Sequence, residues 1–177
     1  MSSNAVGIMD EATEALPIEL RDNGRFKGVF AKRIIRADSI VLYLKGNVST
    51  QPTKYTIQLD NQQHLNLPAN GKTDDDLNYC WQYLNHSCEP NGYINTAEFT
   101  LRALRDITPG KEITFNYLTT ESELAVPFNC RCGSPNCLGF IQGRNFLTRS
   151  QSKILSLVVG EENVITPFIP RHPKVIR

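Results

Sequence analysis

The sequence predicts a mainly β domain, and three observations lead to this prediction. β-branched and aromatic residues gather in short apolar runs separated by polar breaks, a pattern typical of short strands. Turn-forming pairs such as Asp60-Asn61 and Pro109-Gly110 divide the middle of the chain into pieces too short for long helices. The 177 residues, 40% of them hydrophobic, suffice for one domain with its own core.

Short strands are expected over much of the chain. The range 28–48 alternates apolar runs with polar breaks and is expected to hold several of them. Another strand is expected at 55–59, and two more at 99–104 and 112–117, joined by the turn at 108–110. A mainly β architecture follows from these pieces.

One helix is expected near the C-terminus. The range 148–159 is its best candidate, because Thr148 or Ser150 can cap the first turn. Residues 160–177 contain three prolines, which do not fit a regular helix or a central strand. We therefore expect an irregular tail after the helix.

The charge balance excludes a broad electropositive surface. The chain has 19 Lys and Arg residues against 18 Asp and Glu, so its formal net charge is +1 and we expect no sequence-specific binding of nucleic acid. Residues 1–16 lack the features of a secretory signal, and no stretch approaches the roughly 18 apolar residues of a membrane span. We expect a protein that acts away from membranes, in the cytoplasm or the nucleus.

Four of the five cysteines have the spacing of a metal site. Cys130, Cys132 and Cys137 lie within eight residues among turn-forming residues, and Cys88 is the obvious remote fourth ligand. Four thiolates arranged as a tetrahedron bind zinc, although an iron–sulfur cluster uses the same ligand type. Cys80 stands in an apolar run and is expected to pack in the core.

Three segments in order carry a family resemblance. These are NHSCEPN at 85–91, EITFNY at 112–117, and the Cys-x-Cys-x4-Cys-Leu-Gly-Phe-Ile segment at 130–141. Together they resemble the SET-domain protein lysine methyltransferases with a post-SET zinc segment. The upstream range 27–31 looks like the cofactor loop of that family, and 55–61 resembles the strand before its variable insert. No cysteine precedes Cys80 in this sequence, so we expect no pre-SET zinc cluster of the family's kind.

The resemblance implies a mainly β, β-clip-like SET fold of short sheets, in which two segments, 85–91 and 112–117, pass one another in a pseudoknot-like crossing. A zinc-bound post-SET loop and a C-terminal helix complete the expected architecture. The implied divisions are an N-terminal extension at 1–20, the SET domain at 21–120, the post-SET segment at 121–143, and the C-terminal helix and tail at 144–177.

The resemblance also implies an activity, the transfer of methyl groups from S-adenosyl-L-methionine to a lysine side chain. Tyr117 is implied as the principal active-site tyrosine and Tyr55 as a second wall of the lysine channel. Phe115 stands where relatives carry Phe or Tyr, and a phenylalanine there goes with di- or trimethylation. The implied cofactor-binding residues are Phe26, Lys27, Gly28, Tyr83, Asn85 and His86.

Such a site needs tyrosines rather than a strong base. Methyl transfer from a sulfonium is a direct displacement that requires an uncharged amine in line with the methyl carbon. Neutralising a lysine of pKa about 10.4 at pH 7 costs roughly 4 to 5 kcal/mol, which an apolar channel and the sulfonium charge can offset. The zinc is expected to be structural, fastening the post-SET loop over the channel through one of four apolar residues, Phe128, Leu138, Phe140 or Ile141.

Two other classes of protein remain open at this point. A catalytically silent SET-like module could hold a peptide in the channel, as Phe26 and Gln82 would suggest, because they replace a glycine and an arginine common in the family. A small zinc or iron–sulfur redox or structural protein is the third class. The expected partner is a protein or peptide lysine, with a histone tail as the family's commonest target and a basic nucleoid or ribosomal protein as the substitute.

Overall fold

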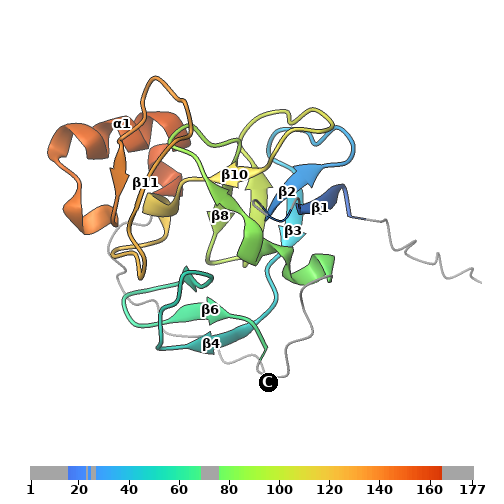
Figure 1. Ribbon diagram of the computed structural model, residues 1–177, viewed down its shortest axis with the longest axis horizontal. Helices are drawn as coiled ribbons and strands as arrows, with labels where there is room; N and C mark the ends of the chain where they lie inside the picture. Colours follow the sequence, from blue (N-terminus) through green and yellow to red (C-terminus); the bar gives the residue numbers. More distant parts are fainter. Residues whose placement is uncertain (1–15, 23, 25–26, 69–75, 165–177) are drawn as a thin grey trace, which may run out of the picture.

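The computed structural model describes residues 16–22, 24, 27–68 and 76–164. Within these residues the protein is mainly β, as predicted, and its strands form five small sheets (Figure 1). The strands are β1 (Ile18–Asp22), β2 (Lys27–Ala31), β3 (Ile40–Tyr43), β4 (Asn47–Ser49), β5 (Ile57–Gln58), β6 (His64–Asn66), β7 (Asn85–His86), β8 (Gly92–Asn95), β9 (Thr100–Ala103), β10 (Thr114–Phe115), β11 (Phe128–Asn129) and β12 (Phe140–Ile141). The helical elements are η1 (Leu77–Tyr83), η2 (Tyr117–Thr119), η3 (Arg144–Phe146), α1 (Arg149–Val159) and η4 (Glu161–Asn163).

Three sheets pair strands that are near one another in the sequence, and two sheets join distant segments. β1 pairs with β2, β11 pairs with β12, and two three-stranded sheets have the orders β3-β9-β8 and β4-β6-β5. The two long-range pairings are the antiparallel pair of β3 and β9 and the parallel pair of β7 and β10, the second of which joins segments 85–86 and 114–115. Figure 1 shows β4 and β6 at the bottom of the molecule and α1 beside β11 at the upper left.

Two predicted strands are shorter than expected. The strand predicted at 55–59 is reduced to β5, because the Tyr55 amide donates to the Thr53 side chain in a local turn. The strand predicted at 112–117 is reduced to β10, because the Asn116 side chain accepts from the Leu118 amide and begins η2. Tyr117 therefore lies on a short helical turn, and the predictions were wrong at both ends of these strands.

The range 28–48 does hold strands β2 and β3 and the start of β4, but its run at Ile34 and Ile35 is not a strand. Ile35 makes only an isolated bridge to Ile107. Strand β9 lies within the predicted range 99–104, while Phe99, at a φ of 54°, belongs to the turn before it. The sequence pattern did not indicate the N-terminal strand β1, which pairs with β2. This strand spans the expected boundary between the N-terminal extension and the SET domain at residue 20.

Helix α1 confirms the prediction for 148–159. Thr148 is its N-cap, and Thr148 and Gln151 form a reciprocal capping box. Gly160, at a φ of 87°, ends the helix, and the short turn η4 follows. Of the predicted irregular tail, 165–177 lies outside the described residues. In the part of the chain that the structure describes, no helix is long and apolar enough to cross a membrane.

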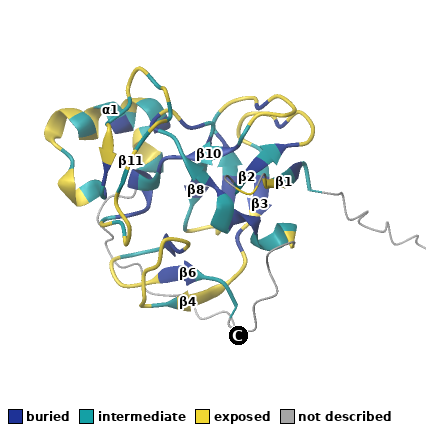
Figure 2. Ribbon diagram, in the orientation of Figure 1, coloured by how far each residue is buried: buried dark blue, intermediate teal, exposed yellow. Residues whose placement is uncertain are grey.

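The core consists of two clusters of buried side chains, drawn in dark blue in Figure 2. The larger cluster surrounds Trp81, whose Nε1 donates to the Lys45 carbonyl at 2.9 Å. Cys80 is 1% exposed in this cluster, which confirms its predicted role in packing. The smaller cluster lies under α1 and includes Cys88 and Ile141. Cys88 is thus a core residue as well as a candidate ligand.

Candidate active site and metal centre

The parallel pairing of β7 and β10 builds the centre of the site. It aligns Asn85 with Thr114 and His86 with Phe115. These residues belong to the two segments, 85–91 and 112–117, that were expected to cross. The Asn91 side chain strengthens the alignment, donating to the Glu112 carbonyl at 2.8 Å and accepting from the Thr114 amide at 3.0 Å. Side chains about thirty residues apart in sequence therefore share one surface.

A cavity of about 540 Å³ opens beside this pairing, within the size range of small-molecule sites. Five of the expected catalytic and cofactor-binding residues line it, namely Tyr55, Asn85, His86, Phe115 and Tyr117. The structure thus gathers the aromatic residues and the polar turn around one space.

Three other expected cofactor residues, Lys27, Gly28 and Tyr83, are not among the residues that line the cavity. Lys27 is connected to it through its carbonyl, which accepts from Asn85 Nδ2 at 3.1 Å. Tyr83 contacts the Tyr55 ring edge-on, with centroids 6.4 Å apart. Phe26 lies outside the described residues.

His86 connects the cavity to the cysteines. Its Nδ1 accepts from the Tyr117 backbone amide at 3.2 Å, and its Nε2 lies 3.4 Å from Cys88 Sγ. Burial lowers the His86 pKa to about 4, so the ring is neutral near pH 7. A neutral ring that accepts at Nδ1 carries its proton on Nε2, which then points at the sulfur.

Tyr117 is a buried phenol with a fixed hydrogen bond. Its hydroxyl donates to the Leu84 carbonyl at 2.7 Å, and its ring lies 4.8 Å from the Phe115 ring and 5.2 Å from the His86 ring between centroids. Burial raises the Tyr117 pKa, and the nearby carboxylates Glu121 and Glu112 raise it further. The phenol therefore stays protonated, and its oxygen keeps lone pairs for another donor.

The four candidate metal ligands come together in space. The Sγ atoms of Cys88, Cys130, Cys132 and Cys137 all lie within 4.8 Å of one another, and those of Cys88 and Cys130 are 3.9 Å apart. Thiolates held about 2.3 Å from a tetrahedral zinc are about 3.8 Å apart, so the spacing of the cluster is close to the one this ion requires. Burial raises the pKa values of Cys88 and Cys130, an effect that a bound cation would reverse.

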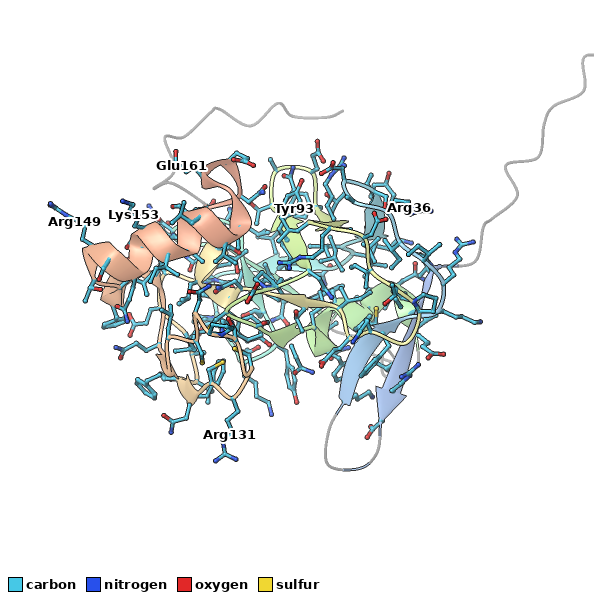
Figure 3. The ribbon with its side chains drawn as sticks, turned by 90° about the horizontal axis from the view of Figure 1, so that it is seen from above. Arg36, Tyr93, Arg131, Arg149, Lys153 and Glu161 are labelled. Atoms are coloured by element: carbon cyan, nitrogen blue, oxygen red, sulfur yellow. The ribbon has the colours of Figure 1, made fainter. Side chains whose placement is uncertain are left out.

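The cysteine loop, residues 128–141, joins this cluster to the cavity. Strands β11 and β12 close the loop, and the Leu138 amide donates to Cys88 Sγ at 3.4 Å. Phe128 lines the cavity and packs against His86 with centroids 5.5 Å apart, whereas Leu138, Phe140 and Ile141 are not among the lining residues. Arg131 also lines the cavity, and its side chain extends outward in Figure 3. A metal on the cysteines would therefore hold one wall of the cavity.

Comparison with known proteins decides the family. The family model described as the SET domain matches residues 27–118. The chain belongs to the SET-domain family. A solved structure supports the fold: the crystal structure of KRYPTONITE in complex with mCHG DNA and SAH superposes with a TM-score of 0.52, at 21% identity, over 71% of this chain and 29% of that one.

Curated relatives of this SET-domain protein include methyltransferases. Methyltransferase flvH of Aspergillus flavus is 37% identical over 101 residues, which are 52% of this chain and 54% of the relative. The H3 lysine-36 specific histone-lysine N-methyltransferase of Saccharomyces cerevisiae is 32% identical over 131 residues, which are 66% of this chain and 18% of the relative. The chain thus spans about half the length of the first and less than a fifth of the second.

Sequence reasoning did not single out several residues of the SET-domain cavity. Trp81 and Glu121 line it, and the backbone amide of Gln58, next to the lining residue Ile57, donates to the Glu121 carboxylate. Gln82 also lines the cavity, and the sequence had singled it out as a residue standing where many family members carry arginine. Gln58 Oε1 accepts from the Ser122 amide at 2.7 Å, which ties β5 to the segment after Tyr117. One weak signal was present: Glu121 is the first charged residue after Glu112.

Removal of the metal is expected to loosen the cavity wall of this SET domain. A zinc chelator, or the substitution Cys132→Ser, should expose amides of the cysteine loop while β3, β8 and β9 stay protected, because the two core clusters are separate. Hydrogen–deuterium exchange with metal analysis measures this. Equal protection of the loop with and without metal would contradict the assignment, and Cys80→Ser is the control for loss of a thiol that is not a ligand.

Substitution of His86 should weaken both of its partners. His86→Ala leaves the buried Tyr117 amide without an acceptor, which costs about 1–3 kcal/mol of unfolding free energy. It also removes the donor to Cys88, and loss of such a support typically lowers metal affinity about 10- to 100-fold. Urea unfolding and zinc competition titrations measure the two effects. An unchanged zinc affinity would show that the contact with Cys88 does not support the metal.

Proposed function

We propose that this SET-domain protein is an S-adenosyl-L-methionine-dependent protein-lysine N-methyltransferase. The observation that carries the proposal is the shared cavity, in which the phenol of Tyr117 and the polar turn of Asn85 and His86 face one space. Relatives named as methyltransferases support it, as do related structures containing SAH. Direct displacement requires such closeness between donor and amine.

The polar end of the cavity suits a cationic donor. Asn85 Nδ2 donates to the Lys27 carbonyl and, at 2.7 Å, to Glu112 Oε1, which fixes the amide orientation. Its Oδ1 has no hydrogen-bond partner among the described residues and so remains available for a ligand ammonium group. Lys27, Asn85 and His86 would hold S-adenosyl-L-methionine, which supplies an electrophilic methyl group when bound.

The aromatic side of the cavity suits a lysine side chain. Tyr55 is 42% exposed and stands at the surface, while Phe115 is 5% exposed and Tyr117 is mostly buried. Apolar walls disfavour the ammonium form of a lysine that enters between them. Because the Tyr117 proton is committed to the Leu84 carbonyl, its oxygen accepts from the amine and orients the amine lone pair.

We propose a di- or trimethylated product. Phe115 lies against Tyr117 and carries no hydroxyl, so it anchors no water and leaves room for added methyl groups. The proposed substrate is a protein lysine such as one in a histone tail, since relatives are named for histone H3 lysine-36 and a related structure holds an H3(1-15) peptide. Action would then take place inside the cell, in the cytoplasm or the nucleus.

The proposed organisation keeps the divisions at 1–20, 21–120, 121–143 and 144–177, with three of the four zinc ligands in the third segment and Cys88 in the second. Labelled S-adenosyl-L-methionine tests the function when it is incubated with the purified protein and core histones, and with mixed basic proteins in parallel. Label transfer supports the methyltransferase. Peptide binding without cofactor binding or label transfer would instead support the silent binding module.

The substitution Tyr117→Phe should abolish most turnover and leave the fold intact. The variant loses one hydrogen bond, to the Leu84 carbonyl, worth about 1 kcal/mol of stability. It also loses the oxygen that orients the amine, so label transfer should fall roughly 100-fold or more. Cofactor binding by calorimetry should change little. Tyr43→Phe, at a residue 60% exposed outside the cavity, is the matched control. Full activity of the Tyr117 variant would refute its role.

The substitution Phe115→Tyr should shift the product toward monomethyllysine. The added hydroxyl narrows the space beside Tyr117 and can hold a water where a further methyl group must fit. Mass spectrometry of the methylated protein measures the product distribution. Phe140→Tyr, at a residue 53% exposed outside the cavity, should leave that distribution unchanged. An identical distribution for both variants would contradict the role of Phe115.

A further inference from the structure

A buried carboxylate shares the cavity with Tyr117. Glu121 is 7% exposed and lines the cavity, two residues after the end of η2, the turn that carries Tyr117. Its Oε1 accepts from the Gln58 amide at 2.8 Å and from the Thr120 hydroxyl at 3.0 Å. Its own amide donates to the backbone carbonyl of Tyr117 at 2.8 Å, so the residue is anchored both at its backbone and at its carboxylate.

The second carboxylate oxygen is left open. Oε2 of Glu121 has no hydrogen bond or ion pair among the described residues. The fully enclosed side-chain polar atoms without a partner, within the described residues, are His64 Nδ1 and Thr100 Oγ1, so Oε2 retains access to open space. Since Glu121 lines the cavity, that space is the cavity. A buried acceptor with an open lone pair is ready for a donor that enters there.

The nearest cation does not neutralise this carboxylate. Arg144 is partly buried, but its Nη1 donates to the Thr119 carbonyl at 3.2 Å rather than to Glu121. Other charged or titratable side chains face the same cavity, and these are Lys54, Tyr55, His86, Glu112, Tyr117, Cys130, Arg131 and Cys132. No salt bridge joins any of them to Glu121 within the described residues.

The proposed reaction needs a proton acceptor, and the other candidate acceptors in the cavity already have hydrogen-bond partners. The Tyr117 hydroxyl donates to the Leu84 carbonyl, and Glu112 accepts from Asn85. Both ring nitrogens of His86 have partners. A lysine enters as an ammonium ion, which cannot attack a sulfonium because it has no lone pair. The Glu121 carboxylate is the acceptor that remains.

We propose that Glu121 is the catalytic base that takes the proton from the substrate lysine ammonium. The inference rests on the proposed methyl transfer. One N–H bond of the ammonium breaks and an O–H bond forms at Oε2, which gives a neutral amine and a neutral carboxylic acid. The amine lone pair then forms the N–C bond as the S–C bond of the donor breaks, and its electrons stay on sulfur. The methylammonium product keeps one positive charge.

The electrostatic setting agrees with this role. Burial raises the Glu121 pKa to about 7, and the bonds from Gln58 and Thr120 and the Arg144 charge oppose part of the rise. A base with a pKa near the working pH combines a large deprotonated fraction with a useful affinity for the proton. An exposed carboxylate of ordinary pKa, about 4.3, would be a much weaker acceptor.

Single-turnover label transfer to core histones, measured from pH 6 to 9, tests the proposal. The wild-type rate should rise through about pH 7 and level off, because Glu121 must be deprotonated. Glu121→Gln, of the same shape, should be slower by roughly 100- to 10,000-fold at pH 7. Its rate should climb about tenfold per pH unit without levelling, following the lysine's own ionisation. Glu123→Gln, at an exposed residue outside the cavity, should match the wild type.

Several results separate this proposal from the methyltransferase assignment. Transfer by Glu121→Gln with the wild-type pH profile overturns the role of Glu121 and leaves the methyltransferase standing. A wild-type pH–rate profile without a plateau also overturns the role of Glu121 and leaves the methyltransferase standing. This result does not depend on whether the variant folds. Carbon-13 NMR of glutamate-labelled protein gives a readout without substrate, in which a carboxyl titrating near pH 7 should vanish in Glu121→Gln. Titration of every carboxyl near 4 to 5 overturns the proposal. No transfer by the wild type at any pH removes the proposed function, and the base with it.

Discussion

The parallel pairing of β7 with β10 is the constraint on which the site depends. Two residues on each side align Asn85 and His86 with Thr114 and Phe115, and Asn91 bonds hold the register. A pair this short has little stability of its own. Buried neighbours from both core clusters pack around it, Phe115 and Leu84 in the larger and Cys88 and Leu118 in the smaller, and this packing stabilises the pair. Without this pairing Tyr117 and Asn85 would not face the same cavity.

His86 extends this constraint to the metal centre. One ring nitrogen accepts from the Tyr117 backbone amide and the other faces Cys88 Sγ, so one side chain links the candidate metal ligand Cys88 to the backbone of Tyr117. A metal ion held by the closed set of four thiolates would have no open position for substrate, so its part would be structural. Burial also explains the proposed roles of the two acidic groups. It raises the pKa of the Tyr117 phenol, which stays protonated, and it raises the pKa of the Glu121 carboxyl to about 7.

Much of this arrangement could be predicted from the sequence. Cysteine spacing predicted the cluster that the structure brings together, and the capping pattern at Thr148 predicted α1. Strand ends at Tyr55 and Asn116 could not be predicted, because side-chain bonds to nearby amides override strand propensity there. Glu121 was also missed, since its burial and its Gln58 partner come from contacts across 63 residues that leave no local pattern. Contacts between residues far apart in the chain are therefore what a single sequence does not predict.

The central claim is that the turn at Asn85 and the phenol of Tyr117 form the two sides of one methyl-transfer site. A crystal structure of the purified protein with S-adenosyl-L-homocysteine and a lysine peptide tests it most directly. The account predicts the thioether in contact with the Asn85–His86 side of the cavity and the lysine amine within hydrogen-bond reach of the Tyr117 hydroxyl. Either ligand bound outside this cavity, or a Tyr117 hydroxyl directed away from the amine, would contradict the account.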